Sequence, residues 1–406
     1  MTKLYHPSSK QIWEGKGFIP ENQVKKLSDH YYKALFDDIV PWWERYSPDK
    51  EFGGYLTRLE RDGTAYSGDK DIWMTGRQIW MFSHLYNSYE DRTRWKEIAC
   101  LGIDFIQKYA FTQEGKMYFR LSRQGRPLSG VLSLYTEVFN AIAIAEYYKI
   151  AANDILKKKA LAMYDRIMAR LGQPTDTPML GYPLTAEFHL HAHDMCRIMV
   201  ASVYSDVWPE QRFEDDINLS CRSILKKHWK PDRGALLENV APDGTPMLDL
   251  PEGRMFHPGH AIESAWMMME IAKKNDNRKL FTTAIDIVLT SLEFGWDNEY
   301  GGLRYLGNID QTPCHNLEAD LKLWWPHCES LYALLIAWAY TGREDIHKWY
   351  EKVHDYTFSN FPDPDYGEWF GYLNRDGSRV WTAKANGWKG FFHLPRILFR
   401  CYQLLT

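Results

Sequence analysis

Residues 53–63 read GGYLTRLERDG, residues 115–125 read GKMYFRLSRQG, residues 234–244 read GALLENVAPDG and residues 367–377 read GEWFGYLNRDG. Each of these segments begins with a glycine and carries a second glycine ten positions later. Two more segments keep only the first glycine: GGLRYLGNIDQ begins at Gly301, and a more diverged segment lies near Gly181. The first glycines follow one another at intervals of roughly 60 residues, as in a repeat architecture. Six such repeats fill the chain of 406 residues.

Each repeated segment is expected to form a short β-hairpin, because an Asp-Gly or Gln-Gly turn between two short runs is a strong hairpin signal. Between the hairpins, apolar residues recur at spacings of three and four, which is typical of amphipathic helices. The pattern predicts twelve helices, two per repeat, over residues 22–46, 71–90, 92–109, 133–150, 153–171, 188–206, 208–228, 259–274, 277–296, 325–341, 343–361 and 389–405.

Within each pair the helix that follows the hairpin is the more apolar, as in ALLIAWAY (residues 333–340), while its partner carries more Lys, Asp and Glu. The first helix should therefore lie inside and the second outside. We expect an all-α (α/α)6 barrel with short hairpins at one mouth, forming a single catalytic domain over residues 1–406. An open solenoid is the alternative, but six similar repeats without polar capping repeats favour closure.

The composition argues against several classes of protein. The net charge is -4 and charges of both signs are interspersed, unlike the one-sided basic surface of a nucleic-acid-binding protein. No run approaches the ~18 apolar residues of a membrane-spanning helix. The six cysteines form no Cys-x-x-Cys pair, and the N-terminal MTKLYHPSSK does not resemble a secretory signal. We therefore expect a cytoplasmic protein without nucleic-acid or membrane partners.

Aromatic residues make up 15% of the chain and include 17 Trp and 25 Tyr. Such rings stack well on the C–H faces of a carbohydrate, and they also fill the interfaces between helices. The excess favours a sugar ligand, although helix packing alone is an alternative explanation.

The repeat pattern predicts where unusual polar residues meet. In a closed ring the inner helices run in the same direction, so their N-termini gather at one mouth together with the hairpins. Arg77, Glu137, His260, Trp325 and His393 each lie between 22 and 26 positions after the first glycine of their repeat. We expect these five side chains to converge at that mouth.

His260 and His393 are the candidate acid and base. An imidazole has an ordinary pKa near 6.5, so it can take or give a proton near neutral pH. Inversion of a carbon beside a carbonyl group needs a base on one face and an acid on the other. The enediolate intermediate needs a positive charge, for which Arg77 is the candidate. The alternative for Arg77 is a salt-bridged scaffold role. The alternative for His260 is a role in helix capping and core packing.

Two carboxylates accompany the histidines. Glu263 lies three residues after His260 on the same helical face, where it can orient the imidazole or hold a substrate hydroxyl. Glu329 lies beside Trp324 and Trp325, which fits a clamp on sugar hydroxyls under a stacking ring. The alternative for Glu329 is an acidic residue in the first turn that interacts with the helix dipole.

A histidine cluster, FHLHAHD, contains His189, His191 and His193. On a helix only His189 and His193 share a face, and no carboxylate or thiol at metal-site spacing completes a recognised motif. We expect no metal here, and a surface or pocket-lining role for His193.

Five motifs together resemble the N-acylglucosamine 2-epimerase family over nearly the whole chain: IWMTGRQIWMF, HPGHAIESAW, KLWWPHCES, EWFGYLNRDG and KGFFHLPR. The resemblance implies an (α/α)6 barrel, commonly dimeric, that interconverts N-acetylglucosamine and N-acetylmannosamine at C2 without a metal. It implies an acid/base role for His260 and His393, and sugar-binding roles for Arg77, Glu263, Glu329, Trp325, Trp388 and His193. Some family members are activated by ATP through a loop rich in glycine and proline. The corresponding stretch here, LGQPTDTPMLG (residues 171–181), matches it poorly, and no cofactor is expected.

Other functions stay open at this point. Within the same superfamily, the chain is also compatible with an aldose-ketose isomerase or with a 2-epimerase of mannose or cellobiose. A glycoside hydrolase would use two carboxylates, for which Glu137, Glu263 and Glu329 are available. A third class is a sugar-binding or protein-binding module without catalysis.

Overall fold

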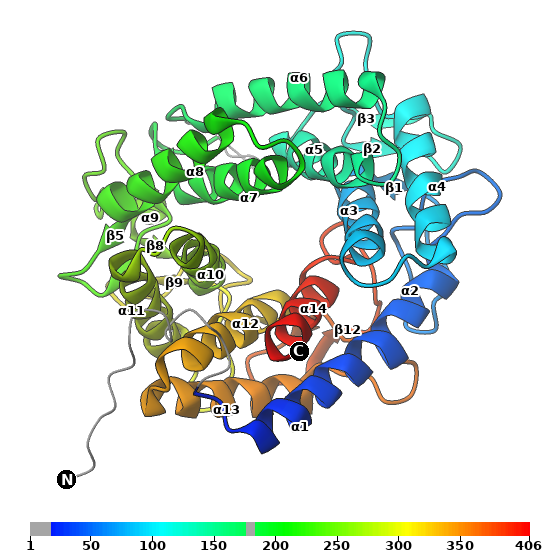
Figure 1. Ribbon diagram of the computed structural model, residues 1–406. Coiled ribbons are helices and arrows are strands. Elements are labelled where there is room, and N and C mark those ends of the chain that lie inside the picture. Colours follow the sequence, from blue (N-terminus) through cyan, green and yellow to red (C-terminus); the bar gives the residue numbers. More distant parts are fainter. Residues whose placement is uncertain (1–17, 176–182) are drawn as a thin grey trace.

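The computed structural model describes residues 18–175 and 183–406, which form a ring of helices in two layers (Figure 1). The predicted (α/α)6 barrel is confirmed. The inner helices are α3 (Ile72–Ser88), α5 (Leu134–Tyr148), α7 (His191–Val207), α10 (Pro258–Lys274), α12 (Trp324–Thr341) and α14 (His393–Leu405). The outer helices are α1 (Glu21–Tyr32), α4 (Thr93–Tyr109), α6 (Asp154–Leu171), α8 (Gln211–Ser223), α11 (Arg278–Gly295) and α13 (Glu344–Asn360). Helix α1 continues through η1 (Lys33–Ile39) into α2 (Val40–Tyr46), and α8 continues into η2 (Ile224–His228).

Burial explains which helix of each pair lies inside. In α12 every residue from Trp324 to Tyr340 is buried, because this helix contacts neighbours on all sides. Its outer partner α13 buries only a single stripe, made of Ile346, Tyr350, Val353 and Thr357. These spacings of four, three and four place one face of the helix against the ring. None of the helices in the described part of the chain is long and apolar enough to cross a membrane.

Three predicted helix starts differ from the structure by three or four residues. The helix expected from residue 208 begins at Gln211. The helix expected from residue 188 begins at His191, because His189–Leu190 forms strand β4 and pairs with β7 (Asn239–Val240). The helix expected from residue 389 begins at His393, after a loop. One short helix, α9 (Pro251–Arg254), was not predicted. The segment near Gly181 and most of the stretch 171–181 lie outside the described residues.

The hairpins join neighbouring repeats. The strand before an inner helix pairs antiparallel with the hairpin of the next repeat in β1–β2, β4–β7, β8–β9 and β10–β11. A bridge between Leu59 and Ala385 joins the first repeat to the last in the same way. The strands are β1 (Lys70–Asp71), β2 (Arg120–Leu121), β3 (Pro127–Ser129), β4, β5 (Trp229–Lys230), β6 (Ala235–Leu236), β7, β8 (Met255–Phe256), β9 (Gly307–Asn308), β10 (Lys322–Leu323), β11 (Tyr372–Leu373) and β12 (Arg379–Trp381).

The second glycine of the repeat has a clear structural role. Gly63, Gly125, Gly244 and Gly377 have φ angles of 86°, 91°, 94° and 87°, a region that strongly favours glycine. At Gly63 an added Cβ would also lie 2.3 Å from the ring of Tyr46. The recurring glycine therefore marks the same tight turn in four repeats.

Three buried ion clusters of the same design connect successive repeats. In each, a lysine before an inner helix pairs with an aspartate of its own repeat, and an arginine from the next hairpin bonds the same aspartate. The third cluster closes the ring, since Lys384 and Asp363 belong to the last repeat and Arg61 to the first. The clusters are Asp49–Lys70–Arg123, Asp297–Lys322–Arg375 and Asp363–Lys384–Arg61.

Candidate active site

The two candidate histidines meet around one tryptophan. The ring of Trp325, in the first turn of α12, lies 5.5 Å from the ring of His260 and 5.3 Å from that of His393, measured between centroids. His260 comes from the first turn of α10 and His393 begins α14. The convergence predicted from repeat position therefore holds for these three residues, which lie where the inner helices begin.

His260 is held by a carboxylate that the sequence did not indicate. Its Nδ1 lies 2.9 Å from Oε1 of Glu238, a residue of the hairpin just before β7. The other oxygen of Glu238 lies 3.3 Å from Nδ1 of His191, and Nε2 of His191 is 2.8 Å from the hydroxyl of Ser264. Glu263, which the sequence offered as the orienting group, instead accepts a hydrogen bond from Arg396 at 2.6 Å.

His393 has a matching carboxylate partner. Its Nδ1 lies 2.7 Å from Oε1 of Glu329, which is fully buried. The indole of Trp266 donates to Oε2 of Glu329 at 2.7 Å, and Arg396 donates to Oε1 at 2.6 Å. The donors that surround Glu329 engage both of its oxygens, so Glu329 orients His393. The contacts of Glu329 therefore show neither the predicted clamp on sugar hydroxyls nor the alternative interaction with the helix dipole.

Arg396 is a second residue that sequence reasoning missed. Its guanidinium links Glu263 and Glu329, and its Nη2 lies 3.4 Å from Nδ1 of His393. A signal for it was present, because it follows His393 by three residues and so shares its helical face. Glu238 carried no such signal.

Arg77 is buried among aromatic rings. Its guanidinium carbon lies 3.9 Å from the ring centroid of Phe139, 4.7 Å from that of Trp73 and 5.1 Å from that of Phe392. Burial lowers the pKa of Arg77 to about 10, against the attraction of Glu263. Over the ranges that the structure describes, Arg77 forms no salt bridge, so the scaffold alternative lacks a partner. A desolvated guanidinium of this kind is suited to bind a developing oxyanion.

The remaining candidates lie at different depths. His193 is buried, and neither ring nitrogen has a hydrogen-bond partner among the described residues. Burial lowers the pKa of His193 to about 4, so this ring is a neutral donor and acceptor. Trp388 is 56% exposed and packs edge-on against Trp73 at 5.3 Å. Glu137 lies 3.6 Å from Arg166 of the outer helix α6, which makes it a structural partner.

Proteins of similar sequence belong to a family of sugar epimerases, which fits this geometry. The sequence profile described as N-acylglucosamine 2-epimerase (GlcNAc 2-epimerase) matches residues 54–396. The N-acylglucosamine 2-epimerase of Mus musculus is 34% identical over 385 residues, which cover 91% of this chain and 90% of the mouse protein. The chain belongs to the N-acylglucosamine 2-epimerase family. The enzyme of Bos taurus with the same name is 34% identical over 95% of this chain and 93% of its own length.

Membership makes the protein an isomerase, since an epimerase inverts one stereocentre of its substrate. The fold agrees: the structure of cellobiose 2-epimerase from Spirochaeta thermophila superposes with a TM-score of 0.79. That match covers 95% of this chain and 98% of the other, at 19% sequence identity.

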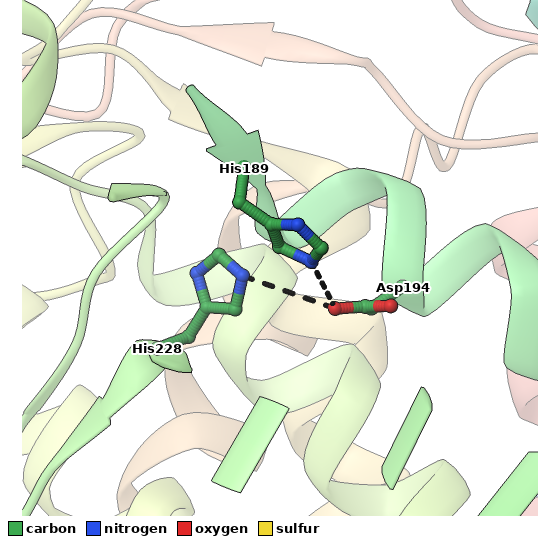
Figure 2. A group of neighbouring side chains, drawn as sticks. All are labelled: His189, Asp194 and His228. Carbon is green, nitrogen blue, oxygen red and sulfur yellow. Dashed lines mark hydrogen bonds and ion pairs between the residues drawn. The ribbon is translucent and has the colours of Figure 1, made fainter. Parts of the chain in front are cut away.

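His189, the first histidine of FHLHAHD, lies in a group with Asp194 and His228, drawn in Figure 2. Lys227 donates to Nδ1 of His189 at 3.3 Å, so the ring proton is on Nε2 and is donated to Asp194 at 2.8 Å. His228 donates from Nδ1 to the carbonyl oxygen of Leu237 at 2.8 Å. The ammonium group beside His189 disfavours a metal ion. His189 lies on β4, so it does not share a helical face with His193.

The pKa values of the two histidines are shifted in opposite directions. Burial acts to lower the pKa of His260, but the charge and hydrogen bond of Glu238 outweigh it and raise that pKa above its ordinary value. Burial, helped by Arg77 and Arg396, lowers the pKa of His393 well below its ordinary value. The pKa of His260 therefore lies above that of His393, so His260 is the better proton donor of the pair and His393 the better acceptor.

Proposed function

We propose that this epimerase interconverts N-acetyl-D-glucosamine and N-acetyl-D-mannosamine by moving the proton at C2. The observation that carries the proposal is the placement of two imidazoles, each held by its own carboxylate, around Trp325. Support for the substrate comes from the names of the relatives that are 34% identical over nearly their whole length.

The geometry leaves one nitrogen of each histidine for chemistry. Because Glu238 and Glu329 occupy the Nδ1 atoms of His260 and His393, Nε2 is the atom available in each ring. Nε2 of His393 takes the C2 proton of the open-chain sugar, and the electron pair moves toward the C1 carbonyl oxygen. Arg77 balances the negative charge on that oxygen. Nε2–H of His260 then returns a proton to the opposite face of C2.

The reverse reaction begins with the opposite protonation state, after a proton has moved from His260 to His393. In the resting enzyme His393 is thus the base and His260 the acid. Trp325 supplies an apolar face between them, and in this proposal Glu263, Trp388 and His193 bind other parts of the sugar.

A panel of sugars followed by NMR tests the substrate. N-Acetylglucosamine should convert to N-acetylmannosamine faster than mannose or cellobiose reacts, and no ketose should form. Formation of a ketose from mannose as the main reaction would favour an aldose-ketose isomerase. Release of a new reducing end from an oligosaccharide would instead indicate a glycoside hydrolase, and binding without turnover a non-catalytic module.

We also propose the domain organisation, oligomeric state, location and cofactor independence of the protein. The protein acts as one catalytic domain, as a homodimer in the cytoplasm, without a cofactor and without nucleic-acid or membrane partners. Light scattering tests the dimer. Activity that survives dialysis against EDTA and does not respond to ATP supports the proposed independence from metal and nucleotide.

A further inference from the structure

We propose that Glu238, held by His191 and Ser264, is the positioning residue that makes His260 the acid of the pair. The inference rests on the proposed function, because it assigns a role within that proton transfer. Glu238 acts through His260, so it is not itself a catalytic residue.

The hydrogen bonds connect Glu238 to two buried side chains of neighbouring helices. The hydroxyl of Ser264 lies 2.8 Å from Nε2 of His191, and Nδ1–H of His191 donates to Oε2 of Glu238 at 3.3 Å. His191 and Ser264 are both fully buried, which prevents this arrangement from exchanging with solvent contacts. Oε1 of Glu238 is then left to accept from Nδ1 of His260.

Among the described residues, Glu238 pairs with two imidazoles and with no Lys or Arg. The contact to His260, at 2.9 Å, is shorter than the contact to His191, at 3.3 Å, so a proton on His260 compensates the buried carboxylate most directly. Glu329 differs, because it has an arginine partner: Arg396, which also pairs with Glu263, lies 2.6 Å from Oε1 of Glu329. The two carboxylates therefore have opposite effects: one stabilises an imidazolium and the other orients a neutral imidazole.

Other titratable groups face His260 and do not replace Glu238. His257 stacks on it at 3.9 Å, and its Nδ1 accepts from the backbone N–H of His260, so this ring is neutral. Glu263 contributes a weaker attraction, and its carboxylate is paired with Arg396. His393, the second histidine of the site, is neutral in the resting state.

The variant Glu238→Gln tests the proposal, with Glu270→Gln as the matched control. The amide oxygen of Gln can still accept from His260, while its NH2 group faces His191, whose ring can then donate to Ser264. Removal of the charge should move the alkaline limb of kcat/KM down by about one to three pH units. Glu270 lies farther along α10 and contacts Tyr332 and Lys273, so its variant should keep the wild-type profile.

Histidine nitrogen NMR of the same proteins provides a readout that needs no turnover. The His260 signal, assigned by its loss in His260→Asn, should titrate about one to three pH units lower in Glu238→Gln than in wild type. Ser264→Ala, which releases His191, should lower the titration midpoint of His260 by a smaller amount. This variant replaces Glu238→Gln in the test if Glu238→Gln does not fold. An unchanged His260 titration in either folded variant would overturn the inference. Absence of turnover in wild type would overturn the proposed function, while the NMR titration would still decide the role of Glu238.

Discussion

Nδ1 of His393 lies 2.7 Å from Oε1 of Glu329, although 64 residues separate them in the sequence. Their contact depends on the packing of neighbouring inner helices, because α12 and α14 belong to successive repeats. Glu238 and His260 lie in one repeat, where the hairpin packs against the start of its own inner helix. Each histidine of the site thus has its own buried carboxylate, and the two carboxylates differ in what else they bind.

Replacement of either histidine should remove turnover without unfolding the protein. We expect His260→Asn and His393→Asn to lower kcat by about 10²- to 10⁴-fold or more, the usual contribution of a positioned acid or base. Circular dichroism and the unfolding midpoint check that the fold is kept. Turnover close to that of wild type in a folded variant would remove that histidine from the reaction.

The pH dependence follows from the two pKa directions. The reaction from the resting state requires neutral His393, whose lowered pKa places the acid limb below pH 6.5, and protonated His260, whose raised pKa places the alkaline limb above pH 6.5. Measurement of kcat/KM across pH should therefore give a bell whose acid limb lies below pH 6.5 and whose alkaline limb lies above it. A single limb centred near pH 6.5 would disagree with the assignment.

Arg77 should matter for the transition state more than for folding. Arg77→Met keeps an apolar side chain among Phe139, Trp73 and Phe392 but removes the positive charge. We expect kcat to fall by about 10²- to 10³-fold, as for loss of an oxyanion donor. Steady-state kinetics separates this result from a pure rise in KM, which would indicate a role in ground-state binding.

Loss of Asp363 should destabilise the closed ring. Asp363→Asn leaves Lys384, whose side chain is fully buried, without its carboxylate, and breaking a buried ion pair costs about 3–5 kcal/mol. Urea unfolding measures the change. The control is Arg212→Ala, which breaks an exposed pair with Asp165 and should cost about 0–1 kcal/mol. Equal effects of the two variants would mean that the ring-closing cluster contributes little.

The fold could be predicted because its signals are local and repeated. The turn at Gly63 needs a positive φ, and this need recurs at Gly125, Gly244 and Gly377. Helical periodicity then supplied the helices between the turns. The prediction was wrong at His189, because the β4–β7 pairing that holds this residue in a strand is a contact between repeats. Short-range periodicity carries no information about such a contact.

The site could be predicted only in part. His260, His393 and Trp325 were found because equivalent positions in a closed repeat become neighbours. Glu238 was missed, since it lies in a hairpin where no spacing relates it to a helix. Likewise, the sequence placed Glu263 near His260 correctly but could not show that the carboxylate of Glu263 would form an ion pair with Arg396.

The most direct test of the account is proton exchange at C2. N-Acetylglucosamine incubated with the enzyme in deuterated water should yield N-acetylmannosamine that carries deuterium at C2, because the returning proton comes from a histidine that has exchanged with solvent. NMR and mass spectrometry of the recovered sugars measure the label. Product that retains hydrogen at C2 under these conditions would contradict the assignment of His260 and His393 as acid and base.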